Sequence, residues 1–289
     1  MANRRPPVGD AIRLLAERLN HSAASPSPEG SASARGGRSR SWTAIIAQCA
    51  FGLILYVAVS LSVGLLSGSA VLGAAVSGPV VFGAVVVWRR WAFGAWSSRP
   101  VSEQAKETRF WVFVLAGLLL CFLGGQSLAV WLYAALGSSA FDTAQSAQNA
   151  APVALLLFSL FVAAPAGEEA LMRGLVHPLL RRRLPVLASA LVSSVVFAAL
   201  HGNLVQVAVA LPLGVLLAFV YEHVGRLWPV VALHALFNLA SVVVPVPLVE
   251  AMATPAVFAA VLLGAAGVLM VLHPTRGDDD RDGRTSPPR

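Results

Sequence analysis

The sequence predicts an all-α fold, a polytopic membrane helix bundle with about eight transmembrane helices. Hydrophobic residues make up 57% of the 289 residues, and charged residues make up only 12%, about half of their usual share in soluble domains. The apolar residues form stretches that reach the length of about 20 residues that a helix needs to cross a bilayer. Basic residues gather between some of these stretches and are missing between others, as is typical of membrane proteins.

Residues 42–273 are predicted to form a transmembrane helical domain, which contains all the expected spans. They cover residues 42–66, 68–88, 110–136, 152–172, 184–203, 205–225, 228–248 and 255–273. Residues 1–41 and 274–289 are predicted to be mostly disordered tails. The first is rich in Ser, Pro, Gly and Arg, and the second contains a run of three aspartates.

The positions of Arg and Lys predict the orientation of the spans. Basic residues follow the second, fourth, sixth and eighth spans, whereas residues 137–150 and 249–254 contain none. We therefore expect a multi-pass protein of the plasma membrane with both termini in the cytoplasm. The net charge of +7 is explained by contact with the anionic surface of the lipid bilayer, and we expect no nucleic-acid partner.

Two adjacent carboxylates lie inside a predicted span, where a charge costs about 2.5–3.5 kcal/mol on insertion scales. Glu169 and Arg173 are four residues apart and share a helix face, so they can form an ion pair. Glu168 points about 100° away from that face. A carboxylate in apolar surroundings without this partner is a candidate general base. The alternative is that Glu168, Glu169 and Arg173 only hold helices together.

Two histidines in apolar surroundings add to this polar group. His201 follows Phe197 by four residues, and His234 precedes Asn238 by four, so each pair shares a helix face. Histidine and asparagine side chains can stabilise an oxyanion while a glutamate activates water. Glutamate and histidine are also ordinary zinc ligands, so Glu168, His201 and His234 form an alternative metal site. The sequence contains no HExxH or GxSxG motif.

Straight helices would place these histidines at different depths. His201 lies about 17 residues from the cytoplasmic end of its span and His234 about six, which leaves a gap of roughly 16 Å. We therefore expect the fifth helix to begin outside the bilayer core, or the chain to depart from ideal geometry near Pro185, Gly202 and Pro229.

The three motifs, in this order, resemble the CPBP family of intramembrane proteases (CAAX protease and bacteriocin-processing, or Abi), over about residues 150–245. The family pattern of EExxxR, FxxxH and HxxxN corresponds here to Glu168-Glu169 with Arg173, Phe197 with His201, and His234 with Asn238. The resemblance implies that Glu168 activates water with help from His201, and that His234 and Asn238 stabilise the oxyanion. Glu169 would belong to the same catalytic group, and Arg173 and Phe197 would support it.

The resemblance also implies a reaction and a substrate class. The chain would be an intramembrane endopeptidase that cleaves membrane-associated peptides or proteins. Both a metal-dependent and a metal-free, glutamate-dependent mechanism are proposed for this family, so the cofactor is either a divalent metal such as zinc or none. Two alternatives use the same polar cluster: a non-catalytic membrane immunity or scaffold protein, and a proton-coupled transporter.

Overall fold

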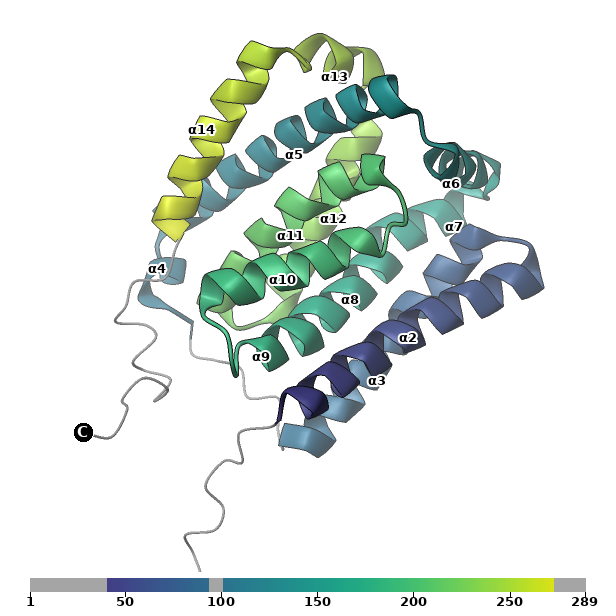
Figure 1. The fold of residues 1–289 in the computed structure, drawn as a ribbon, viewed down its shortest axis with the longest axis vertical. Coiled ribbons are helices and arrows are strands. Elements are labelled where there is room, and N and C mark those ends of the chain that lie inside the picture. Colours follow the sequence, from purple (N-terminus) through teal and green to yellow (C-terminus); the bar gives the residue numbers. More distant parts are fainter. Residues whose placement is uncertain (1–40, 94–100, 273–289) are drawn as a thin grey trace, which may run out of the picture. The chain divides into compact units, whose positions relative to one another are not determined.

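The computed structural model describes residues 41–93 and 101–272, so the two predicted tails, apart from Ser41, lie outside the described residues. Every regular element within these ranges is a helix. The predicted all-α polytopic membrane bundle is therefore confirmed. In Figure 1, α2 and α3 run side by side along one edge of the bundle, and α5 and α14 run along the opposite edge.

Each predicted span corresponds to one helix, to a continuous helical run or, in one case, to a bent pair of helices. In chain order these are α2 (Trp42–Ser67), α3 (Ala70–Phe93), α5 (Thr108–Leu136), the run from α7 to α9 (Val153–Leu180), α10 (Val186–Ala199), α11 (Leu204–Val224), α12 (Leu227–Val243) with α13 (Val246–Met252), and α14 (Pro255–Leu272). Two connecting helices, α4 (Glu103–Lys106) and α6 (Ser139–Ala150), flank α5.

The described helices differ from the expected eight full spans in two places. Six helices are long and apolar enough to cross a membrane, and α12 with α13 makes a seventh if the pair is one span. That pair bends by 97° at Pro245, which has no N–H to continue a helix. The remaining helix, α10, has only 14 residues and rises about 21 Å, less than the bilayer core of about 30 Å.

The short length of α10 has a local cause at each end. Pro185 is its N-cap residue, and Gly202 has a positive φ of 72° in the turn that follows it. Both features were expected to disturb straight helical geometry, and both do. Pro229, in contrast, lies in the first turn of α12, where proline is tolerated, and α12 continues past it without a break.

The helical run from α7 to α9 carries the two glutamates and is not uniformly α-helical. The π-helical segments η2 (Ser159–Ala163) and η3 (Ala170–Val176) flank α8 (Ala164–Glu169). Single π turns inside α-helices occur frequently at functional sites, because they change which backbone carbonyls are free to accept hydrogen bonds. α7 (Val153–Phe158) and α9 (His177–Leu180) complete the run.

Two glycines allow α3 and α8 to approach with their backbones in contact. A Cβ atom on Gly78 would lie 2.5 Å from the carbonyl carbon of Ala163, and one on Gly167 would lie 2.8 Å from the carbonyl oxygen of Gly78. These distances are shorter than any real Cβ contact. Glycine at both positions therefore sets how closely the α2–α3 hairpin packs against the helix that bears the glutamates.

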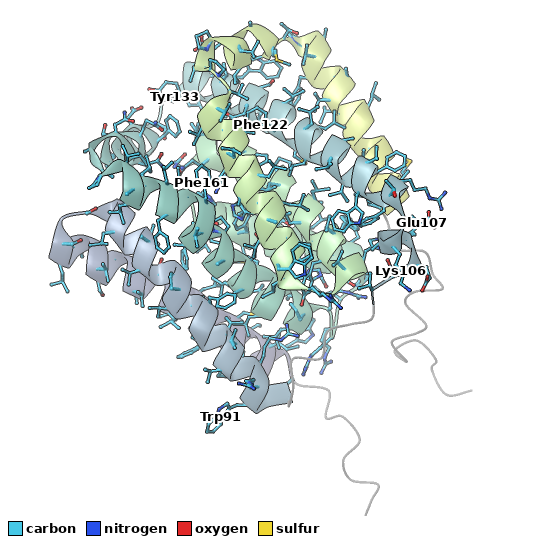
Figure 2. The ribbon with its side chains drawn as sticks, turned by 180° about the vertical axis from the view of Figure 1, so that it is seen from behind. Trp91, Lys106, Glu107, Phe122, Tyr133 and Phe161 are labelled. Carbon is cyan, nitrogen blue, oxygen red and sulfur yellow. The ribbon has the colours of Figure 1, made fainter. Side chains whose placement is uncertain are left out.

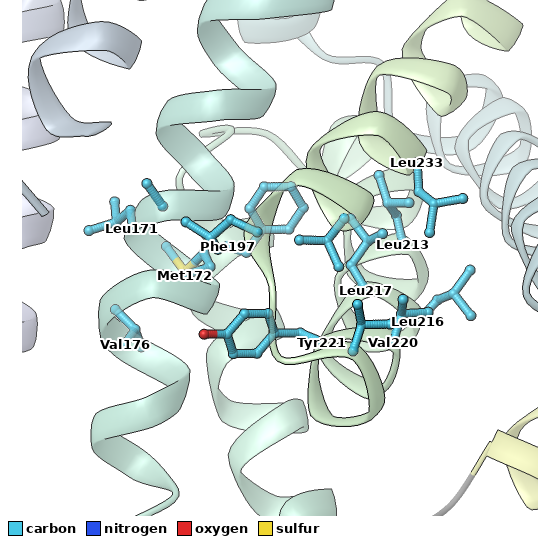
Figure 3. Packing of buried hydrophobic residues seen from close by; sticks show 14 of the residues in the cluster. Leu171, Met172, Val176, Phe197, Leu213, Leu216, Leu217, Val220, Tyr221 and Leu233 are labelled. Carbon is cyan, nitrogen blue, oxygen red and sulfur yellow. The ribbon is translucent and has the colours of Figure 1, made fainter. Parts of the chain in front are cut away.

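The hydrophobic core lies between η3, the end of α10, α11 and α12. Fully or nearly fully buried side chains from these helices interlock there, including Leu171, Met172, Phe197, Leu213 and Leu217. Figure 3 shows Phe197 between the helix that carries Leu171 and the one that carries Leu213. In Figure 2, Trp91, Lys106 and Glu107 lie near one end of the helices and Tyr133 near the other.

Candidate active site

The buried ion pair expected within the EExxxR motif is present. Glu169 and Arg173 lie one turn apart at the junction of α8 and η3, and the Arg173 Nη1 atom is 3.1 Å from Glu169 Oε1 and 3.0 Å from Oε2. Both side chains are essentially inaccessible, at 0% and 1%. The Arg173 Nη2 atom also donates to the Gly214 carbonyl of α11. These contacts offset the cost of burying the two charges.

His234 connects the two glutamates. Its Nδ1 atom donates a hydrogen bond to Glu169 Oε1 at 2.9 Å, and its Nε2 atom lies 3.8 Å from Glu168 Oε2. The second distance is too long for a hydrogen bond but is within the range of an ion pair. The imidazole is held by the ion-paired carboxylate and presents its other nitrogen to Glu168. His234 and Glu168 are both buried, at 4% and 8% exposed.

Glu168 has a partner that the sequence did not predict. The Tyr56 hydroxyl on α2 donates a hydrogen bond of 2.9 Å to Glu168 Oε1, across 112 residues of sequence. A polar hydroxyl in the middle of an apolar span signals that some partner is needed, because buried tyrosine hydroxyls are usually bonded. That signal cannot identify the partner, since it depends on how α2 packs against α8.

His201 reaches this group through Phe197. Its Nδ1 atom donates to the Phe197 carbonyl at 3.2 Å, which folds the imidazole back along α10. The rings of His201 and His234 both meet the Phe197 ring edge-on, at centroid distances of 5.2 and 5.7 Å. The structure thus gathers both histidines around one aromatic ring. Among the described contacts, Glu168 is approached by His234 and Tyr56, whereas His201 contacts Phe197.

Asn238 makes a contact that supports the π-helical turn. Its Nδ2 atom donates to the carbonyl of Leu160, within η2, at 2.8 Å. Arg89 on α3 donates in the same way to the carbonyl of Gly174, within η3, at 2.8 Å. Each π segment therefore has a backbone carbonyl that a side chain from another helix satisfies. Nothing in the sequence indicates these two acceptors, because they arise from the local helix geometry.

The donors at this site do not fit the zinc site that the resemblance allows. In the part of the chain that the structure describes, no three His, Cys, Asp or Glu side chains are grouped closely enough to hold a metal ion. Glu168 and His234 lie together, and the described contacts of His201 are with Phe197.

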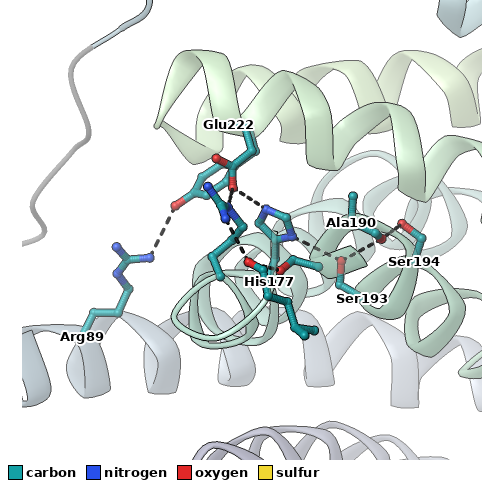
Figure 4. A network of polar contacts seen from close by, with 10 residues as sticks. Arg89, His177, Ala190, Ser193, Ser194 and Glu222 are labelled. Atoms are coloured by element: carbon teal, nitrogen blue, oxygen red, sulfur yellow. Dashed lines mark hydrogen bonds and ion pairs between the residues drawn. The ribbon is translucent and has the colours of Figure 1, made fainter. Parts of the chain in front are cut away.

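A second buried polar cluster lies where α9 meets α11 (Figure 4). Glu222 Oε1 accepts from His177 Nε2 at 2.7 Å and from Arg181 Nε at 3.0 Å. Ser193 Oγ lies 3.5 Å from His177 Nδ1. His177 and Ser193 are 0% and 1% exposed, so this serine, histidine and glutamate are closed to any substrate. The cluster anchors the end of the helix that bears the glutamates to α10 and α11.

A cavity of about 200 Å³ lies at the opposite end of α10 from this cluster. It is lined by the end of α5, the start of α6 and the turn that follows His201, including Leu136, Ser138, Gly202 and Asn203. None of its lining residues belongs to the group around Glu168. It borders the segment next to His201 but does not open onto the carboxylates.

A comparison with protein families matches the segment that contains the three motifs. Residues 149–240 match the family model described as "Type II CAAX prenyl endopeptidase Rce1-like". No curated protein and no solved structure matches the chain significantly. The matched segment begins just before α7 and ends within α12, so Tyr56 and the whole α2–α3 hairpin lie outside it. The segment that carries the three motifs thus matches the model of the type II CAAX prenyl endopeptidase Rce1-like family, in agreement with its resemblance to the CPBP proteases.

Proposed function

We propose that this chain is an intramembrane endopeptidase that cleaves membrane-associated peptides or proteins with a water molecule activated by Glu168. The observation that carries the proposal is the contact series Tyr56–Glu168–His234–Glu169–Arg173, four titratable groups and a phenol joined within one buried site. The family of the matched segment supports the same reaction.

The charges of this group can balance without a metal. With both carboxylates ionised, Arg173 and a protonated His234 bring the sum to zero. His234 then donates through Nδ1 to Glu169, and its Nε2–H points toward Glu168 Oε2. Two polar atoms 3.8 Å apart are too distant to bond directly but close enough for one oxygen atom to contact both.

The proposed reaction uses these two atoms in turn. Glu168 Oε2 removes a proton from water, and the water oxygen attacks the carbonyl carbon of the substrate. The Nε2–H of His234 donates to the resulting oxyanion. The C–N bond then breaks, and Glu168 returns the proton to the departing amine, which leaves a free carboxylate and a free amine. In this scheme His201 and Asn238 support the site without contacting the reacting atoms. His201 bonds to the Phe197 carbonyl, and Asn238 donates to the Leu160 carbonyl in η2.

The experiment compares Glu168→Gln with Glu250→Gln after reconstitution into nanodiscs. Glu250 lies on the exposed helix α13, so the same chemical change there serves as the matched control. We expect Glu168→Gln to slow cleavage by about 10²- to 10⁴-fold, the usual contribution of a general base, and Glu250→Gln to leave it unchanged. Cleavage by Glu168→Gln at the wild-type rate would reject the proposal.

Two substrates separate the substrate classes. One is a farnesylated peptide with a C-terminal CAAX sequence, and the other is an unprenylated transmembrane peptide. Mass spectrometry of the products identifies the cleaved bond in each. Cleavage of the first alone would match the prenyl endopeptidase family of the matched segment, and cleavage of the second would extend the substrates to unmodified membrane peptides.

The two other functions predict different results. For a scaffold or immunity protein, alanine variants of the cluster lose stability and neither peptide is cleaved. For a proton-coupled transporter, a pH gradient across proteoliposomes drives uptake. The proposal includes a plasma-membrane location with both termini in the cytoplasm, which reporter fusions at each terminus test.

A further inference from the structure

We propose that Tyr56 is a positioning residue for Glu168, so that the α2–α3 hairpin is part of the active site although it lies outside the family segment. The inference rests on the proposed function. Its basis is the 2.9 Å hydrogen bond from the Tyr56 hydroxyl to Glu168 Oε1, which leaves the other carboxylate oxygen facing His234.

The hydrogen bond decides how the carboxylate is oriented. The bond from the Glu168 side chain to its carboxyl group rotates over a broad, roughly two-fold range when nothing holds it. A donor on Oε1 fixes the plane of the group, and Oε2 then lies 3.8 Å from His234 Nε2. A hydrogen bond to an ionised group is stronger than one between neutral groups. In apolar surroundings the free energy of this hydrogen bond therefore exceeds the entropy cost of fixing the carboxyl group.

The α2–α3 hairpin, which carries Tyr56, packs closely on the helix of Glu168 at two glycines. Gly52, one turn before Tyr56 on the same face of α2, packs so closely on η3 that a Cβ atom would lie 2.6 Å from Leu175 and 2.9 Å from Leu171. On the neighbouring helix, Gly78 of α3 meets Gly167 of α8 backbone to backbone. The phenol is therefore carried by a hairpin that touches the helix of Glu168 at two glycine contacts.

The chain offers a matched control for the hydroxyl. Tyr133 on α5 also donates to a carboxylate, Asp142 Oδ1, at 2.7 Å, but this pair is exposed and lies in a different part of the fold. Tyr56→Phe and Tyr133→Phe therefore remove the same hydroxyl and the same type of hydrogen bond. They differ in whether the acceptor is Glu168.

The kinetic experiment measures kcat and KM for both variants in nanodiscs with the peptide that the wild-type protein cleaves. We expect Tyr56→Phe to lower kcat by about 10- to 100-fold, as misplacement of a reacting group does, with KM within about twofold of wild type. Tyr133→Phe should change neither. Equal kcat values for the two variants, or a loss in Tyr56→Phe that lies only in KM, would overturn the inference.

A second experiment needs no substrate and separates this inference from the proposed function. Thermal unfolding of Tyr56→Phe, Glu168→Met and the double variant forms a double-mutant cycle. If the two side chains interact, the double variant should lose less than the sum of the single losses, by about 2 °C or more in Tm. Additive losses would overturn the inference, whatever the activity. If the cycle shows that the two side chains interact but the wild-type protein cleaves neither peptide, the inference stands and the proposed function is rejected.

Discussion

The close packing of α3 against η2 and α8 makes Gly78→Ala a sharp test of the structure. The added Cβ would lie 2.5 Å from the carbonyl carbon of Ala163, and an ordinary contact begins at 3.4 Å. The two helices must therefore separate by about 1 Å, because both sides of the contact are backbone and neither can rotate away. Overpacking of this kind costs about 1–3 kcal/mol.

The variant should show two measurable effects. For a protein of this size a loss of 1–3 kcal/mol lowers Tm by about 2–12 °C. The α2–α3 hairpin also carries Tyr56, so a separation of 1 Å should loosen its bond to Glu168 and reduce peptide cleavage by up to about 100-fold. Thermal unfolding in nanodiscs and the cleavage assay measure the two effects on the same preparation.

The same substitution on the same helix provides the control. Gly83 is exposed, and a Cβ atom there would meet no atom within 4 Å. Gly83→Ala should leave Tm unchanged or raise it slightly, because alanine favours a helix by about 1 kcal/mol over glycine. If Gly78→Ala matches Gly83→Ala in both Tm and activity, the backbone contact between α3 and α8 is wrong.

Three further predictions concern the buried polar groups. Arg173→Met removes the guanidinium partner of Glu169 in a fully buried site and leaves this carboxylate only its hydrogen bond from His234, so thermal unfolding should show a loss of about 3–5 kcal/mol. Lys106→Met, at an exposed ion pair, should change stability by less than about 1 kcal/mol. Asn238→Ala removes the donor to the Leu160 carbonyl and should cost about 1–3 kcal/mol in the same assay, while Asn149→Ala on the exposed face of α6 should cost nothing measurable. Because the described donors do not converge on a metal, dialysis against a chelator should leave peptide cleavage unchanged, and recovery of lost activity by added zinc would contradict this.

Local sequence properties predicted that the chain is a membrane helix bundle and which polar residues lie in its site. Apolar stretches near 20 residues predicted the helices, since each must satisfy its own backbone in lipid. The spacing of four between Glu169 and Arg173 predicted their ion pair, because helix geometry alone places these side chains on one face. The order of the three motifs predicted the family that the segment 149–240 matches.

Lengths of spans were less predictable than their positions. The stretch 184–203 is apolar throughout, yet α10 occupies only Val186–Ala199. Hydropathy measures the side chains, whereas Pro185 and Gly202 act on the backbone. For the same reason the predicted span 228–248 is bent at Pro245.

What the sequence determined by itself is which residues are costly in lipid and therefore need partners: Glu168, Glu169, Arg173, His201 and His234. What only the tertiary structure decided is the identity of those partners. Tyr56 meets Glu168 because glycines let α2 and α3 approach the helix of the glutamates, and Phe197 contacts both His201 and His234 because the end of α10 meets α12. Contacts across a hundred residues depend on packing between helices, and no periodicity along a single helix contains that information.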